Sequence, residues 1–172
     1  MFTRCTFQWN QAQGTSEEDY GGGAVRVAGG EGNAEVSGAA DGTLFANCRF
    51  IGNQAVDLAG ALDIDCLAET ASCTVRVVNC TFTQNHATGD AQHAGSIGGI
   101  RHELGTLVLK NTILWGNTDT DGDTTTQQAR FRDDGDGSIT RAYDCVEGLD
   151  DGVINSVDSP AVSPRYGRSV GD

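Results

Sequence analysis

The chain has 172 residues, 24 of them acidic and 11 basic, and a formal net charge of −13 at pH 7. This length suits one domain with one core. No stretch approaches about 18 consecutive apolar residues, so a transmembrane helix is excluded, and the negative charge argues against a nucleic-acid partner.

One short phrase recurs along the chain. Its four clear copies end in asparagines that lie 43, 32 and 32 residues apart, and a fifth, decayed copy spans 144–148. Recurrence at a fixed period is the sequence signature of a repeat architecture, in which each repeat buries its inner face against the next. The four copies are 4–10, 47–53, 79–85 and 111–117.

Two other elements recur between these copies. A run of small residues leads into a strand at 21–27, 59–64 and 98–101, and an aliphatic run precedes the phrase at 42–45, 74–78 and 105–109. Each period therefore offers short alternating strands separated by Gly, Asn and Asp, without a sustained period of 3.6 residues. The sequence predicts an all-β solenoid of about four to five coils, a parallel β-helix.

Stacked coils place equivalent residues in columns. We expect two core columns and one turn column, in which Asn tolerates a positive φ and its amide bonds the next Asn along the stack. One core column is predicted to contain Cys5, Cys48, Cys80, Thr112 and Cys145. The other is predicted to contain Phe7, Phe50, Phe82 and Leu114, and the turn column Asn10, Asn53, Asn85 and Asn117.

The Phe-x-x-Asn copies, together with Gly-Gly-Ala-Val at 22–25, resemble the paired motifs of polymorphic outer-membrane-protein repeats. The resemblance implies a right-handed parallel β-helix over residues 1–148, at a cell surface or outside the cell. It also implies adhesion, ligand binding or, in other branches, polysaccharide cleavage. Residues 149–172 contain both prolines and are expected to form a C-terminal cap or tail.

The start of the chain has no basic stretch followed by an apolar run, as a secretory signal would require. The chain opens inside a repeat, so we expect it to be part of something longer. Six cysteines in an acidic chain favour an exported protein, secreted or on the cell surface, and Cys66 and Cys73 are the candidate disulfide.

Two aspartate-rich loops are the candidate metal sites, because Ca²⁺ binds six to eight oxygens. Neither fits an EF-hand: counting from Asp119, glycine falls at the fourth position instead of the sixth, and Arg130 is the twelfth residue. A solvated acidic loop is the plainer interpretation, and no cofactor is required. The candidate calcium ligands are Asp119, Asp121, Asp123, Asp134 and Asp136.

The small-residue runs lead into strands that carry charged residues at alternating positions. One alignment puts Arg26, Asp63 and His102 in an outward column, whereas the hydrophobicity of the third copy turns Arg101 outward and His102 inward. Either way an arginine lies beside a carboxylate on neighbouring coils. The plainer alternative to a site is a solvated face with an ion pair across coils. The candidate ligand-binding residues are Arg26, Asp63, Asp65, Arg101 and Glu103.

These observations predict a binding or adhesion module without catalysis, whose partner is a glycan or another surface. One alternative is a polysaccharide-cleaving enzyme, a lyase or glycoside hydrolase, in which two groups supply acid and base. The other is a structural subunit that pairs with another chain through its open solenoid ends. The candidate catalytic residues of the enzyme alternative are Asp63, Asp65, Arg26, Arg101 and His102.

Overall fold

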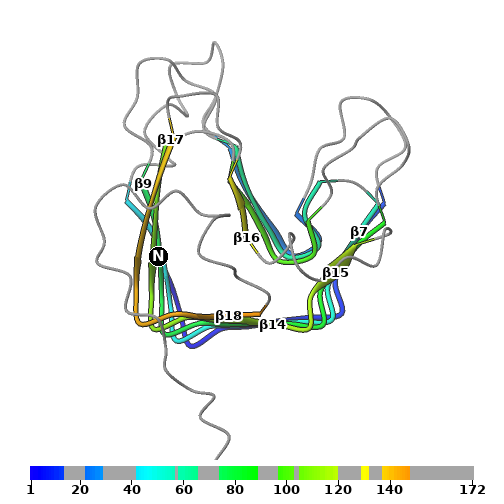
Figure 1. Cartoon of the computed structure of the whole chain (residues 1–172). Helices are drawn as coiled ribbons and strands as arrows, with labels where there is room; N and C mark the ends of the chain where they lie inside the picture. The colour runs from blue at the N-terminus through cyan, green and yellow to red at the C-terminus, as the bar shows by residue number, and fades with distance from the viewer. Residues whose placement is uncertain are drawn as a thin grey trace, which may run out of the picture.

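The protein is a parallel β-helix, in which each turn of the chain adds one strand to each of several stacked parallel sheets (Figure 1). The computed structural model describes residues 1–13, 22–28, 42–56, 58–65, 74–88, 97–102, 105–119, 129–131 and 137–147. These residues form strands, bridges and turns and contain no helix. The predicted all-β solenoid is therefore confirmed. The predicted cap at 149–172 lies outside the described residues.

Four sheets, which we name A to D, contain all the described strands. Sheet A contains β1 (Phe2–Thr3), β5 (Thr43–Ala46), β9 (Thr74–Val78), β13 (Gly105–Lys110) and β17 (Gly137–Ala142). Sheet B contains β2 (Thr6–Gln8), β6 (Arg49–Ile51), β10 (Thr81–Thr83), β14 (Ile113–Trp115) and β18 (Cys145–Val146). Sheet C contains β3 (Gln11–Ala12), β7 (Gln54–Ala55), β11 (His86–Ala87) and β15 (Thr118–Asp119). Sheet D contains β4 (Val25–Ala28), β8 (Leu62–Asp65), β12 (Ile100–His102) and β16 (Ala129–Phe131).

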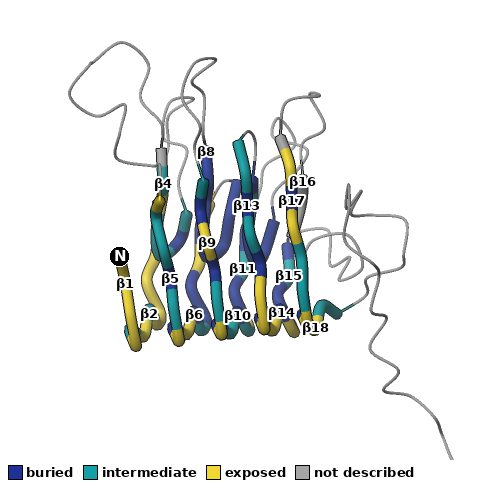
Figure 2. Tube along the Cα trace, turned by 90° about the vertical axis from the view of Figure 1, so that its left-hand side faces the viewer, coloured by how far each residue is buried: buried dark blue, intermediate teal, exposed yellow. Residues whose placement is uncertain are grey.

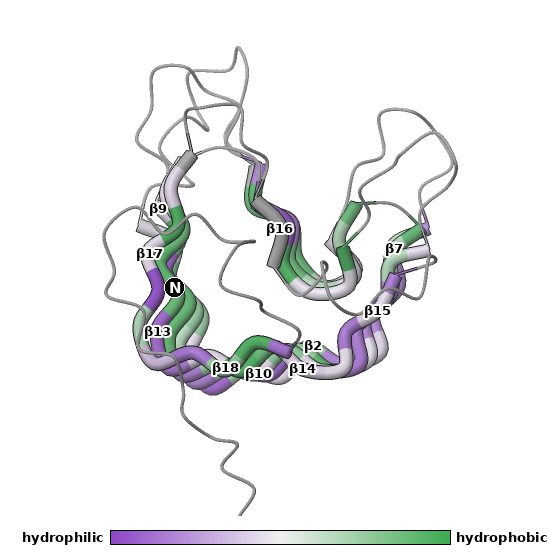
Figure 3. Tube along the Cα trace, viewed as in Figure 1, coloured by the Kyte–Doolittle hydropathy of each residue, from purple (hydrophilic) through white to green (hydrophobic). Residues whose placement is uncertain are grey.

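The core lies between sheets A, B and D, where apolar segments surround a common interior (Figure 3). The predicted aromatic column is confirmed, because Phe7, Phe50, Phe82 and Leu114 are successive Cα partners in sheet B. The ring centroids of Phe7 and Phe50 are 4.6 Å apart, and those of Phe50 and Phe82 are 4.3 Å apart. Burial increases from the first coil toward the middle of the stack (Figure 2).

The predicted cysteine column is correct for its first four members and wrong for Cys145. Backbone hydrogen bonds align Cys5, Cys48, Cys80 and Thr112 on successive coils, but Cys145 is the Cα partner of Ile113 and is exposed. The residue that continues the column is Asp144, whose Oδ1 accepts a hydrogen bond from the Thr112 backbone N–H at 2.7 Å. A shift by one residue turns a side chain to the other face of its strand.

The thiols of Cys48 and Cys80 are buried hydrogen-bond donors. Cys80 Sγ donates to the carbonyls of Val78 and Phe45 at 3.3 and 3.5 Å. Burial is the main influence that raises the pKa of the Cys80 thiol to about 11, so the thiol stays protonated near neutral pH. The four described cysteines, Cys5, Cys48, Cys80 and Cys145, are free thiols. The predicted disulfide partners Cys66 and Cys73 lie outside the described residues.

Residues with positive φ make two corners of the first four coils and, in the fifth, the described corner between sheets A and B. The corner between sheets B and C has φ of 57° to 65°, but it falls one residue before the predicted asparagine column. The expectation of positive φ at those asparagines was therefore wrong. The corner residues between sheets B and C are Trp9, Gly52, Gln84 and Gly116. Those between sheets A and B are Arg4, Asn47, Asn79, Asn111 and Tyr143.

The predicted asparagine ladder is confirmed, and its inner members are buried. Nδ2 of each asparagine donates to Oδ1 of the asparagine on the next coil, at 2.9 Å from Asn10 to Asn53 and at 2.8 Å from Asn53 to Asn85 and from Asn85 to Asn117. The same Oδ1 atoms accept the preceding asparagine's backbone N–H at 3.0 to 3.1 Å. Nδ2 of Asn85 also donates to the carbonyl of Phe50. All four hydrogen-bonding positions of the Asn53 and Asn85 amides are used.

Glycines bring sheet D against sheet C at the place where the chain turns back (Figure 1). A Cβ on Gly60 would lie 2.4 Å from the carbonyl oxygen of Gly98 and 2.7 Å from the backbone nitrogen of His86. A Cβ on Gly98 would lie 2.4 Å from the backbone nitrogen of Thr118. Since these neighbours are backbone atoms, only glycine fits. This close approach explains why the small-residue run recurs with the asparagine phrase.

We predict that Asn85→Asp lowers the free energy of unfolding at pH 7 by about 3–5 kcal/mol. Aspartate has the same shape as asparagine, but its second carboxylate oxygen replaces Nδ2 and its two donor hydrogens. That oxygen would face two other acceptors, the carbonyl of Phe50 and Oδ1 of Asn117. Asn10→Asp is the matched control, because Asn10 is the exposed end of the ladder, and we expect a loss of about 1 kcal/mol there. Urea unfolding of both variants measures the difference. If Asn85→Asp and Asn10→Asp lose the same free energy of unfolding, the claim that the buried amides contribute more than the exposed one is contradicted.

Candidate functional site

Strand β8 is buried on both of its faces. Leu62 and Ile64 are fully buried in the core, and the intervening Asp63 is also 0% exposed. Asp65 is 4% exposed. Because side chains alternate along a strand, the two aspartates lie on the face of sheet D that is turned away from the core. Two buried carboxylates on one face require charged partners.

The register of sheet D decides between the two alignments of the sequence analysis. Asp63 is the Cα partner of Arg26 on one side and of Arg101 on the other. His102 is instead the partner of Ile64 and is 0% exposed. The alignment that placed His102 outward beside Asp63 was wrong, and the alignment with Arg101 outward and His102 inward is confirmed.

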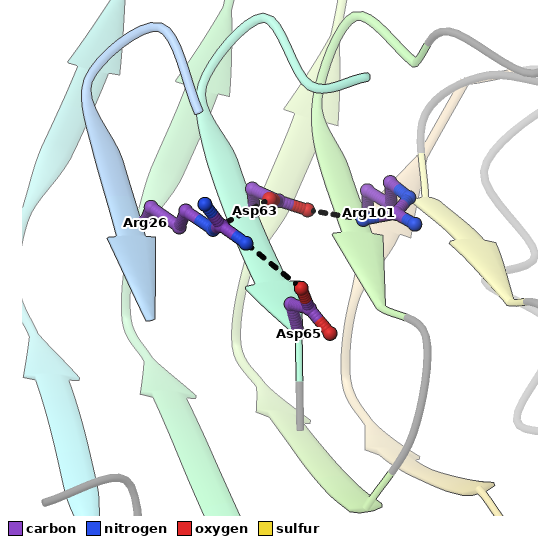
Figure 4. A network of polar contacts seen from close by, with 4 residues as sticks. All are labelled: Arg26, Asp63, Asp65 and Arg101. Atoms are coloured by element: carbon purple, nitrogen blue, oxygen red, sulfur yellow. Dashed lines mark hydrogen bonds and ion pairs between the residues drawn. The ribbon is translucent and has the colours of Figure 1, made fainter. Parts of the chain in front are cut away.

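Four of the predicted site residues come together in what we call the arginine–aspartate cluster: Arg26, Asp63, Asp65 and Arg101 (Figure 4). Arg101 Nη1 donates to Asp63 Oδ1 at 2.9 Å, and Arg26 Nη2 donates to Asp65 Oδ2 at 2.9 Å. Arg26 Nε lies 3.6 Å from Asp63 Oδ2. The cluster thus joins β4, β8 and β12 across three coils. Glu103, the fifth predicted ligand-binding residue, lies outside the described residues.

The cluster contains two positive and two negative side chains, so its charges balance. Burial is the largest influence on Asp63 and raises the pKa of its carboxyl group, and Asp65 acts in the same direction. The guanidinium groups of Arg101 and Arg26 oppose this shift by stabilising the carboxylate. The Arg101 side chain is 12% exposed and that of Arg26 is 34% exposed, so the arginines cover the carboxylates.

This burial limits the chemistry of the cluster. A general acid or base must reach within hydrogen-bond distance of its substrate, and Asp63 reaches no solvent. Its Oδ1 atom is already bound to Arg101. In this arrangement the cluster links neighbouring coils, as in the plainer alternative of the sequence analysis, although here the carboxylates are buried rather than solvated.

One of the five predicted calcium ligands is described. Asp119 lies in β15 as the Cα partner of Ala87 and is 6% exposed. Asp121, Asp123, Asp134 and Asp136 lie outside the described residues. Within the described ranges, no group of three or more His, Cys, Asp or Glu side chains is placed to hold a metal ion. Calcium binding therefore stays a prediction.

The sequence analysis missed three exposed apolar residues, which we call the outward apolar patch: Ile113 and Trp115 on the outward face of sheet B, and Tyr143 on the adjoining corner between sheets A and B. Their exposed fractions are 44%, 52% and 77%. Ile113 and Trp115 flank the buried Leu114 on β14, and Tyr143 lies on a corner two residues before Cys145, the Cα partner of Ile113. A signal was present in the sequence. The two positions that flank Leu114 hold Ile and Trp, whereas the equivalent positions of β10 hold Thr81 and Thr83.

Comparison with protein-family models, with curated proteins and with solved structures finds no match for this chain. Across the residues that the structure describes, no helix is long and apolar enough to cross a membrane. The function must therefore be argued from the chain's own residues.

We predict that Asp63 and Arg101 are energetically coupled. Asp63→Asn and Arg101→Gln each remove the buried, hydrogen-bonded ion pair between these two side chains, and we expect each to lower the free energy of unfolding by about 2–4 kcal/mol. The double variant should lose about 2 kcal/mol less unfolding free energy than the sum of the losses in the two single variants. Urea unfolding of the four proteins measures this coupling, and strictly additive losses would contradict it. Arg26→Gln, in the more exposed arginine, should couple to Asp63→Asn by at most about 1 kcal/mol.

Proposed function

We propose that the protein is a binding module without catalytic activity, and that the outward apolar patch on sheet B is its glycan-binding surface. The observation that carries the proposal is the exposure of Trp115 on the outward face of sheet B, whose opposite side packs into the core, and of Tyr143 on the adjoining corner between sheets A and B. Exposed aromatic rings held by a rigid scaffold are typical of interaction sites.

The chemistry of the patch suits a sugar. The indole of Trp115 and the phenol ring of Tyr143 offer flat apolar surfaces to the C–H faces of a sugar ring, and the Tyr143 hydroxyl can donate a hydrogen bond. Neighbouring positions of sheet B hold Thr81, Thr83 and Arg49, whose polar groups suit the hydroxyls of a chain of sugars. Adjacent strands are about 4.8 Å apart, which gives such a ligand a regular surface.

The arginine–aspartate cluster supports the non-enzymatic side of the proposal. The paired groups that a polysaccharide-cleaving enzyme would need are buried and bound to one another. Secretion or display at the cell surface fits glycan binding and belongs to the same proposal, with the resemblance of the repeats as its support.

We predict that a glycan array identifies a ligand whose affinity falls at least tenfold in Trp115→Ala, as measured by isothermal titration calorimetry. Trp9→Ala is the matched control: Trp9 is 62% exposed but lies on the first coil, three coil spacings or about 14 Å from the coil of Trp115. It should bind within twofold of the unchanged protein. Equal affinity of Trp115→Ala and the unchanged protein would contradict the proposed surface.

The same glycan is then tested for chain cleavage. We expect no product, because Asp63 is enclosed by its ion pairs. Formation of product that Asp63→Asn abolishes would refute the non-enzymatic proposal and support the lyase or glycoside hydrolase alternative.

A further inference from the structure

The strands of sheets A and B carry basic residues but no acidic ones, although the chain as a whole has a formal net charge of −13. The described corner residues between these two sheets also include no Asp or Glu. Each of the first four coils places one exposed basic residue on this outward surface. We call these residues the basic belt: Arg4, Arg49, Arg76 and Lys110.

The basic belt is not neutralised by the described part of the chain. All four residues are exposed, and so is the corner that they flank (Figure 2). Among the described residues none of the four forms an ion pair, and Arg49 Nη2 donates to the Thr6 hydroxyl at 3.3 Å. The described carboxylates that flank β18, Asp144 and Glu147, accept hydrogen bonds from backbone N–H groups. The belt therefore differs from the arginine–aspartate cluster, in which the charges balance.

The basic belt is continuous with the outward apolar patch. Arg49 lies in the same column of sheet B as Ile113, two coil spacings or about 10 Å away. Lys110 is the Cα partner of Ala142, which directly precedes Tyr143. Basic and aromatic side chains thus adjoin on one outward surface, where a single ligand can contact both.

Exposed asparagines at the corner between sheets A and B add hydrogen-bond donors to this surface. Asn79 Nδ2 donates to Asn47 Oδ1 at 3.3 Å, and Asn111 Nδ2 donates to Asn79 Oδ1 at 3.0 Å. Each of these two Nδ2 groups has a second hydrogen, which no described residue accepts. Such donors suit the hydroxyl groups of a sugar as well as the oxygens of an anionic substituent.

We propose that the ligand of the outward apolar patch is an anionic glycan, a sugar chain with carboxylate or sulfate groups, and that the basic belt binds those groups. This inference rests on the proposed glycan binding and names the class of glycan. A guanidinium group binds two oxygens of such a substituent through two parallel hydrogen bonds. Because successive members of the belt lie on successive coils, about 4.8 Å apart along the stack, the belt offers partners to several anionic groups of one chain.

The net charge of the protein is compatible with this ligand. At physiological ionic strength, charges more than about 8 Å apart are largely screened, so the sign of the local surface determines which ligand binds. Nucleic acid is a poorer fit. Duplex DNA carries one charge per about 1.7 Å of its length, and its binding depends on neutralising many phosphates, for which four basic residues are few. A glycan also uses the amides of the corner and the aromatic rings of the patch.

The test measures binding of the full chain to three oligosaccharides that share one backbone: dextran, carboxymethyl-dextran and dextran sulfate. Isothermal titration calorimetry gives each affinity at low and at physiological salt. We expect at least one anionic probe to bind at least tenfold more tightly than dextran, and its affinity to fall as salt is added. The comparison between carboxymethyl-dextran and dextran sulfate identifies which anionic group the belt prefers.

Variants of the belt show whether its charges carry this preference. Arg49→Gln combined with Lys110→Gln should weaken binding of the preferred anionic probe at least tenfold and leave binding of dextran within twofold. The matched control, Arg49→Lys combined with Lys110→Arg, keeps both charges and should stay within threefold of the unchanged protein. Arg4→Gln combined with Arg76→Gln removes the other two charges and should also weaken binding at least tenfold. Circular dichroism and thermal melting establish that these exposed positions leave the fold intact.

Equal affinity for the three probes would overturn the inference, as would an anionic preference that persists in both Gln variants. The absence of saturable binding of either anionic probe at millimolar concentration would overturn it too. Single-stranded DNA of equal charge that binds as tightly would assign the belt to polyanions in general and likewise overturn it. The proposed function fails separately, through Trp115→Ala: equal affinities that all fall in this variant would preserve glycan binding by the patch and remove only the anionic class.

Discussion

The buried asparagine ladder is the interaction on which the arrangement of the coils depends. A primary amide has two donors and two acceptor positions, and Asn53 and Asn85 satisfy all of them without water. This is achieved only when each asparagine lies directly above the last, since a shift by one residue would leave buried polar atoms without partners. The ladder therefore fixes the register of sheets B and C, and the aromatic column follows from the same register.

The register of sheet D follows from that of sheet C through the glycines. Gly60 and Gly98 allow the returning chain to approach the backbone of His86 and Thr118, so each small-residue run is positioned by the phrase beside it. Asp63 consequently meets an arginine on each side. The charges of sheet D join neighbouring coils, and the exposed aromatic side chains of the outward apolar patch lie elsewhere, on sheet B and its corner with sheet A.

The sequence was sufficient to predict the columns whose members are chemically alike. The Phe and Asn columns could be found because the residues recur at the same offset in each phrase. Cys145 was misplaced because the fifth copy of the phrase is degenerate. Aligning Cys145 with the earlier cysteines shifts the strand by one residue from its observed register, in which Asp144 occupies the column and Cys145 pairs with Ile113. The same one-residue ambiguity left His102 with two orientations, and pairing with Ile64 resolved it. The burial of Asp63 could not be predicted, because it depends on arginines from two other coils at once.

Hydrogen exchange of the asparagine side-chain amides, followed by NMR, tests the ladder most directly. If the ladder holds the coils in register, the Nδ2 protons of Asn53 and Asn85 exchange as slowly as backbone amides of the core strands, while those of the exposed Asn10 exchange faster. Exchange of Asn53 and Asn85 at the rate of solvent-exposed asparagines would contradict the claim that these amides fix the register.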